Sequence, residues 1–191
     1  MPTLQCHAGT GDLPVHRLDA TAELSGAAPG DAPRLTARFV LEAQLAAFVL
    51  PPRGVPRRAD GLWQHSCFEL FVRLRGAAAY AEVNVAPSAE WAAYRFTARR
   101  TGMRPIDAAW QAAIASTVSA SSLALDFSLP LAALLDAPPP QAVLEFGFAA
   151  VLESRHGRLS YWALAHPDPA RPDFHHPGSF VHAIRYRAAD R

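Results

Sequence analysis

Hydrophobic and polar residues alternate with a period of two along most of the chain, which is the pattern of β-strands that bury one face. The alternation is clearest in residues 67–74, where Phe68, Leu70 and Val72 form the apolar face, and it returns in residues 80–85. The same pattern predicts further strands at 35–41, 91–97, 110–119, 123–127, 143–152, 159–164 and 180–186. The chain is therefore expected to be built almost entirely from short strands.

Glycine and proline turns separate these segments, and many short strands punctuated in this way predict an all-β, antiparallel β-sandwich of the jelly-roll kind. Two segments could instead be helical. Residues 41–50 are rich in Ala and Leu, and residues 130–135 begin with a proline that is tolerated at a first helical position. Residues 26–33 and 51–61 are expected to be surface loops. With 191 residues and no linker or repeat, the chain is predicted to be a single domain, 1–191.

The phase of the alternation also predicts which side chains fill the core. One face of each expected strand is apolar, and that face should point toward the opposite sheet. The expected core residues are Phe39, Phe68, Leu70, Val83, Val85, Leu125, Phe127, Phe146 and Phe148.

Composition narrows the classes of partner. Half of the residues are hydrophobic and the net charge is +1, so neither disorder nor a nucleic-acid partner is expected. There is no apolar run of about 18 residues and no basic, then apolar, leader at the N-terminus, so the expectation is a cytoplasmic protein without a membrane partner. The two cysteines, Cys6 and Cys67, have no metal-binding or disulfide-framework spacing.

Three polar residues share the face opposite the predicted core. Glu69 alternates with Phe68 and Leu70, while Glu82 and Asn84 alternate with the apolar residues of the next strand. If the two strands pair, these side chains lie on one surface with Trp63 at its edge. Carboxylates and an amide can bond sugar hydroxyls, and an indole can stack on the apolar face of a sugar ring. The alternative interpretation is an ordinary solvated sheet face.

The stretch containing Trp63, Glu69 and residues 80–85 resembles the core of family 9 carbohydrate-binding modules. These modules belong to the wider DOMON-like group of β-sandwich domains, whose members bind sugars or haem. Residues 159–164 and 172–180 resemble the uncharacterised bacterial DOMON-like proteins, so that the similarity runs from about residue 35 to about residue 186.

The resemblance implies a non-catalytic domain that binds a small ligand, a neutral sugar, between two aromatic walls. Trp63 matches one wall, and Phe174 matches the other because it stands three positions before a proline, as the opposite wall does in these modules. Glu69 and Asn84 match two residues that hydrogen-bond the sugar.

Two positions depart from the pattern of the family. Glu82 stands where the sugar-binding modules have an arginine, and Phe174 replaces a tryptophan. The first change makes the predicted pocket more acidic, which disfavours anionic sugars and allows neutral or cationic ligands, with Arg95 as a partner that could neutralise Glu82. The second change leaves a smaller stacking surface.

Two alternative interpretations of the sequence include a bound metal ion or haem. His166, His175 and His176 lie close together near the C-terminus and could ligate a metal ion, although their spacing matches no metal motif. Some DOMON relatives are b-type cytochromes, so Met103 with His65, His175 or His176 could ligate haem. We expect no cofactor.

Two further alternatives concern the same polar surface. Glu69 and Glu82 could form the carboxylate pair of a glycoside hydrolase, but the family resemblance assigns Glu69 to binding rather than to acid–base chemistry. The pocket could also be vestigial, in a domain that now serves as an interaction scaffold.

Overall fold

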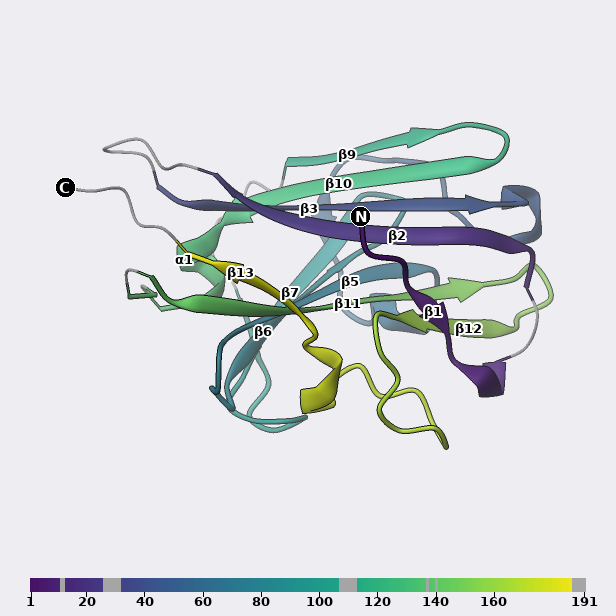
Figure 1. Ribbon diagram of the computed structural model, residues 1–191. Coiled ribbons are helices and arrows are strands. Elements are labelled where there is room, and N and C mark those ends of the chain that lie inside the picture. The colour runs from purple at the N-terminus through teal and green to yellow at the C-terminus, as the bar shows by residue number, and fades with distance from the viewer. Residues whose placement is uncertain (11–12, 26–31, 107–112, 137, 140, 187–191) are drawn as a thin grey trace.

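The computed structural model describes the chain from residue 1 to 191 apart from 11–12, 26–31, 107–112, 137, 140 and 187–191. Two β-sheets pack face to face and form the upper and lower layers of Figure 1. The strand pairs are antiparallel except for a two-residue parallel pairing of β4 with β7. The predicted antiparallel β-sandwich is therefore confirmed. Among the described residues, no helix is both long and apolar enough to span a membrane.

The smaller sheet has four strands in the order β2-β3-β10-β9. Their bounds are Val15–Ser25, Arg34–Ala43, Ser122–Pro130 and Ala113–Val118, respectively. A short helix, α1 (Leu131–Leu134), follows β10 directly, where the sequence predicted a single turn after Pro130. All three pairings are antiparallel, so each strand alternates between the core and solvent.

The larger sheet has nine strands, with the main order β1-β12-β11-β5-β6-β7-β4. Strand β13 also pairs with β11, and β8 pairs with β7. Their bounds are β1 Gln5–Cys6, β4 Arg57–Arg58, β5 Cys67–Leu74, β6 Tyr80–Val85, β7 Glu90–Phe96, β8 Arg104–Pro105, β11 Val143–Glu153, β12 Leu159–Ala163 and β13 His182–Arg185. The central strands β5, β6 and β7 supply the surface on which the candidate site is built.

The core between the two sheets is apolar and rich in aromatic residues. All nine predicted core residues are at most 1% exposed. Phe39 of the small sheet packs on Phe68 and Phe148 of the large sheet, with ring centroids 5.4 and 5.9 Å apart. The phase predicted from the alternation is therefore confirmed on both sheets.

The large sheet is buried on its other face as well. Cys67 and Phe71 of β5, with Tyr94 of β7, belong to a second apolar cluster on the side away from the small sheet. The 3₁₀ turn η3 (Leu62–Gln64) and the segment 164–181, which contains the 3₁₀ turn η4 (Pro177–Ser179), cover this face and add Leu62, Phe174 and Phe180 to the cluster. This explains why every residue of β6 is buried.

Several expectations about the elements were wrong or incomplete. Residues 41–50 form no α-helix: β3 continues to Ala43, and only the 3₁₀ turn η2 (Leu45–Ala47) follows. The pairing of β3 with β10 keeps this part of the chain extended despite its helix-forming composition. The long strand β2 was missed, and the 3₁₀ turn η1 (Ala8–Thr10) precedes it. Of the predicted 26–33 loop and 110–119 strand, residues 26–31 and 110–112 lie outside the described residues.

Candidate functional site

A pocket of about 440 Å³ opens on the outer face of the large sheet. Four of the five predicted site residues line it: Trp63, Glu69, Glu82 and Phe174. The fifth, Asn84, lies directly opposite Glu69 in the pairing of β5 with β6. The other lining residues are Phe96, Arg100, Met103, Val151, Tyr161, Pro172 and His175. The structure thus brings together the residues that the sequence analysis selected.

Small neighbours leave room above the polar residues of the sheet. Asn84 pairs with Ala92 on one side and with Glu69 on the other, and Glu69 pairs in turn with Ala149. Both alanines are almost fully buried. Because successive side chains of a strand point to opposite faces, the polar row and its alanines share the outer face. The floor of the pocket is therefore a polar patch.

The polar groups of the floor are buried and only partly hydrogen-bonded. Glu69 and Glu82 are 3% and 4% exposed, and Asn84 is fully buried. The Asn84 amide nitrogen Nδ2 donates to Glu82 Oε1 at 2.7 Å. Within the described part of the chain, Glu69 Oε1 and Asn84 Oδ1 have no hydrogen-bond partner. Leaving such atoms without partners costs about 1–3 kcal/mol each, so the floor is suited to a ligand that carries hydrogen-bond donors.

Burial makes both floor carboxyls weak acids. It raises the pKa of Glu69 well above its usual value, and the neighbouring Glu82 raises that pKa further, while Arg100 opposes both effects. Burial also raises the pKa of Glu82 to about 7, although the bond from Asn84 and the charge of Arg100 act to lower it. Near neutral pH the floor therefore carries less than two full negative charges.

Aromatic side chains form the walls above this floor. Trp63 extends from η3 and keeps 39% of its surface exposed, with its ring edge-on to Tyr94 at 6.0 Å. Phe174 is held in place by Tyr161 of β12, with ring centroids 6.2 Å apart. Gly61, just before η3, has a φ of 78°, which lets the chain turn sharply and present Trp63.

A histidine and a tyrosine connect the floor to the rim. The Tyr80 hydroxyl accepts a bond from the Arg100 backbone N–H at 3.2 Å and lies 2.6 Å from His175 Nδ1. Burial, together with the charge of Arg100, lowers the pKa of His175 to about 4. His175 is therefore neutral near pH 7. Since the Tyr80 hydroxyl already accepts the Arg100 N–H, we assign its proton to the bond with Nδ1 and the ring proton of His175 to Nε2, which lies 3.8 Å from Glu82 Oε2.

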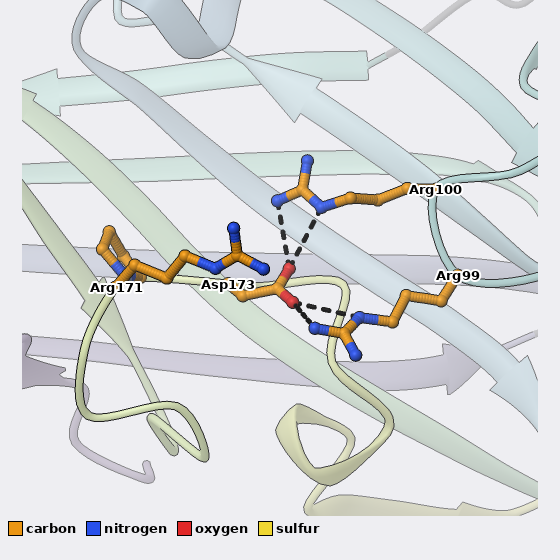
Figure 2. Close-up of a pocket in the computed structure, with 5 residues that line it drawn as sticks. Arg99, Arg100, Arg171 and Asp173 are labelled. Carbon is orange, nitrogen blue, oxygen red and sulfur yellow. Dashed lines mark hydrogen bonds and ion pairs between the residues drawn. The ribbon is translucent and has the colours of Figure 1, made fainter.

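An aspartate anchors two arginines beside the pocket (Figure 2). The guanidinium groups of Arg99 and Arg100 both hold the Asp173 carboxylate, Arg100 through Nε and Nη2 at 3.2 and 3.0 Å. Burial opposes ionisation of Asp173, but these bonds keep its pKa below the usual value. Arg99, Arg100 and Asp173 line a second hollow next to the pocket. Arg171 also lines this hollow, and its Nε pairs with Asp168 Oδ2 at 3.4 Å.

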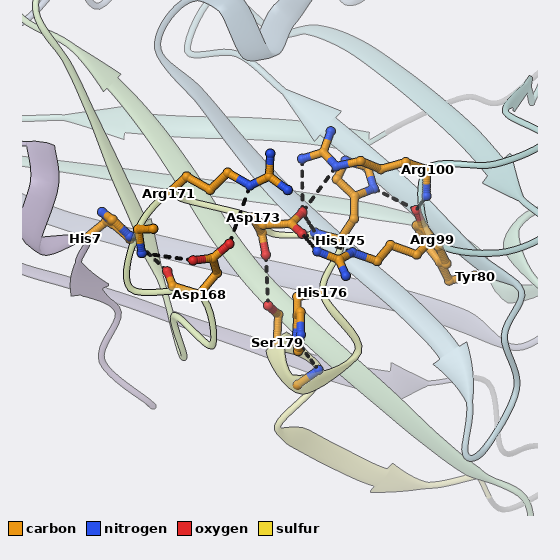
Figure 3. Close-up of polar contacts among 12 residues, drawn as sticks. His7, Tyr80, Arg99, Arg100, Asp168, Arg171, Asp173, His175, His176 and Ser179 are labelled. Atoms are coloured by element: carbon orange, nitrogen blue, oxygen red, sulfur yellow. Dashed lines mark hydrogen bonds and ion pairs between the residues drawn. The ribbon is translucent and has the colours of Figure 1, made fainter.

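Figure 3 shows how this anchor orders the rim. The backbone carbonyl of Asp173 accepts a bond from the Ser179 hydroxyl at 3.3 Å, and its carboxylate accepts one from the His175 backbone N–H at 3.2 Å. The anchor thus fixes the segment carrying Phe174 and His175 against the loop carrying Arg100.

The three candidate metal ligands do not come together. His166 Nε2 lies 2.8 Å from the Gln5 carbonyl oxygen, and His176 Nδ1 accepts a bond from the Gly178 N–H, whereas His175 faces the pocket. No group of three or more metal-ligating side chains occurs among the described residues.

Two other assignments based on the sequence change with the structure. Arg95 does not neutralise Glu82: it bonds Asp136 at 2.7 Å, because β7 directs Arg95 to the face opposite Tyr94 and the pocket. His65, a candidate haem ligand, pairs with Glu153 at 2.8 Å instead of lining the pocket.

Three residues that line the pocket were not predicted from the sequence: Arg100, Tyr161 and Phe96. Phe96 could have been found, because it shares the phase of Tyr94 in an alternating strand. Tyr161 follows the same logic in β12. Arg100 gives no such signal: it lies in a tight turn, at a φ of 53°, and only the folded chain brings it to the pocket.

No family model and no curated protein matches the chain. Solved structures do. A candidate carbohydrate-binding protein from Bacteroides uniformis is 14% identical, with a TM-score of 0.57 over 88% of this chain and 86% of that one. A family 9 carbohydrate-binding module from Caldicellulosiruptor kristjanssonii, in complex with cellotriose, is 12% identical, with a TM-score of 0.48 over 99% and 83% of the two chains. The first likeness shows that the two proteins share a β-sandwich fold.

Proposed function

We propose that this domain binds a sugar in the pocket over β5 and β6 and catalyses no reaction on it. The observation that carries the proposal is a pocket of about 440 Å³ with aromatic walls and a floor of buried acceptor atoms without protein partners. Sugar rings offer apolar C–H faces for stacking and hydroxyls for donation, which matches both surfaces. The fold shared with a candidate carbohydrate-binding protein is consistent with this proposal.

Binding is measured by isothermal titration with a panel of neutral monosaccharides. Trp63→Ala should weaken binding of any sugar that binds by about tenfold or more, because it removes a stacking wall. It should leave the fold intact, since Trp63 is only partly buried. Val118→Ala, an exposed apolar position on β9 of the other sheet, is the matched control and should bind as the wild type does. Failure of every neutral sugar in the panel, and of glucosamine, to bind would refute the proposal.

Hydrolysis is tested directly. A glycoside hydrolase needs one carboxyl that is protonated and one that is ionised at its working pH. The pKa of Glu69 is raised well above its usual value and that of Glu82 to about 7, so the two pKa values alone do not separate binding from hydrolysis. Incubation with aryl glycosides should release no phenol, and steady release that Glu69→Gln abolishes would contradict the non-catalytic reading.

Haem remains the second candidate because Met103 and His175 line the same pocket. The residues do not fit it well: His175 Nδ1 is bonded to Tyr80, and Nε2, the other potential ligating atom, faces Glu82 3.8 Å away. The purified protein is incubated with hemin and then separated from unbound hemin. The absence of a Soret band from the separated protein would rule out haem binding.

A further inference from the structure

The pocket floor holds buried hydrogen-bond acceptors that lack partners among the described residues. These acceptors are Glu69 Oε1 and Asn84 Oδ1, and both belong to side chains that are at least 97% buried, since Glu69 is 3% and Asn84 0% exposed. The Asn84 amide, which is the donor of the floor when both carboxyls are ionised, already bonds Glu82. A ligand group with several hydrogen-bond donors would therefore satisfy these acceptors.

The basic groups around the floor are already engaged elsewhere. Arg100 and Arg99 hold Asp173, and no ion pair to Glu69 occurs in the part of the chain that the structure describes. His175 is 3.8 Å from Glu82, but its ring is buried and accepts a bond from Tyr80. Without an ion pair to Glu69 the buried carboxyls ionise only in part, and a bound cation would stabilise their ionised form.

We propose that the sugar bound in this pocket carries a primary amine, and that its ammonium group contacts the carboxyls of Glu69 and Glu82 and the Asn84 carbonyl oxygen. This inference rests on the proposed function. An ammonium group has three donors, one for each of these three side chains, and bonds between charged partners are about twice as strong as neutral ones. The aromatic walls, Trp63 and Phe174, would hold the ring while the amine reaches the floor.

An amine is favoured over a hydroxyl because an ammonium group stabilises the ionised form of the carboxyls, in which they are acceptors only. A hydroxyl donates a single hydrogen and brings no charge, so it would satisfy one of the two unpartnered oxygens and leave the carboxyl pair uncompensated. An acetylated amine keeps one N–H but loses the charge and adds bulk. The three forms of one sugar therefore test the contribution of the charge separately from that of the ring.

The experiment titrates the full chain with glucose, glucosamine and N-acetylglucosamine by calorimetry at a pH where the amine is protonated. We expect glucosamine to bind about tenfold or more tightly than the other two, as bonds to charged groups imply. Glu69→Gln and Glu82→Gln should each lower the ratio of glucosamine affinity to glucose affinity toward one, whatever they do to glucose binding itself, and circular dichroism checks that both variants fold. Val118→Ala should keep the full preference.

The outcomes separate the two proposals. Equal affinity for glucose and glucosamine overturns the amine inference and leaves sugar binding standing. Binding of cyclohexylamine without any of the three sugars upholds the amine site and overturns sugar binding. No binding of any of the four compounds overturns both. A glucosamine preference that survives both Gln variants also refutes the assignment to this floor.

Discussion

Replacing Glu82 by glutamine should make the protein more stable, and increasingly so as the pH rises. Glu82 is almost fully buried, and the wild-type chain must either keep it protonated or bury its charge. Glutamine has nearly the same shape, can still accept the bond from Asn84 through its amide oxygen, and has no charge to bury. The substitution therefore removes one titration and leaves the packing in place.

The size of the effect follows from proton linkage. The pKa of Glu82 rises from an ordinary value of 4.5 to about 7 in the folded chain. Below pH 4.5 the carboxyl is protonated in both folded and unfolded states, so it contributes no difference. Between these two values the folded state holds the extra proton, and the wild type loses stability as the pH rises. At about 1.4 kcal/mol per pKa unit, the loss is about 3 kcal/mol once the pH exceeds about 7.

Urea unfolding of both proteins across this pH range measures the effect as a difference in unfolding free energy. His175, whose pKa is lowered to about 4, loses its contribution as the pH falls through the same range, so the wild type alone shows only the sum of two opposing trends. His175 is present in both proteins and largely cancels in the difference. Glu42→Gln, at an exposed position on β3, corrects for the loss of a surface charge. A difference between Glu82→Gln and wild type that stays constant with pH would refute the reasoning.

Three further predictions concern the core, the rim and the turn that carries Arg100. Phe39→Ala should lower the free energy of unfolding by about 3–5 kcal/mol in urea titrations, because it removes the ring that packs on Phe68 and Phe148 and leaves a cavity between the sheets. Asp173→Asn should lower the free energy of unfolding by about 1–3 kcal/mol. The stability of this variant should also depend less on acid, because the pKa of Asp173 is lowered in the folded chain, so that the carboxylate contributes stability above pH 3.8 and loses it as the pH falls further. Gly102→Ala should cost more than about 1 kcal/mol in thermal unfolding, because φ is 64° and the added methyl would collide with Thr97; an unchanged melting temperature would contradict that prediction.

The alternation of β5 and β6 was enough to predict both the core and the pocket floor. In strands a residue's phase decides its face, so placing Phe68 and Leu70 in the core also placed Glu69 on the opposite face. The sequence could not show that this opposite face is covered, since the covering segment containing Phe174 is irregular and far away in the chain. Trp63 and Phe174 came from the family resemblance, not from periodicity.

The missed strand β2 has a different explanation. Its buried residues include Leu18, Ala20 and Ala22, which do alternate, but alanine is a poor strand former and weakens the signal. Arg100 and Arg99 reach Asp173 only through tertiary contacts across 73 and 74 positions of sequence. Such contacts leave no periodic trace along the chain.

Because floor and core residues alternate on the same two strands, the floor is as rigid as the core. Glu69 cannot shift along or out of the sheet unless Phe68 and Leu70, both fully buried, move with it. The amide protons of β5 and β6 should therefore exchange with solvent only through near-global opening. A ligand then finds its acceptors already in place, and the conformational entropy lost on binding is confined to the loops around the pocket mouth.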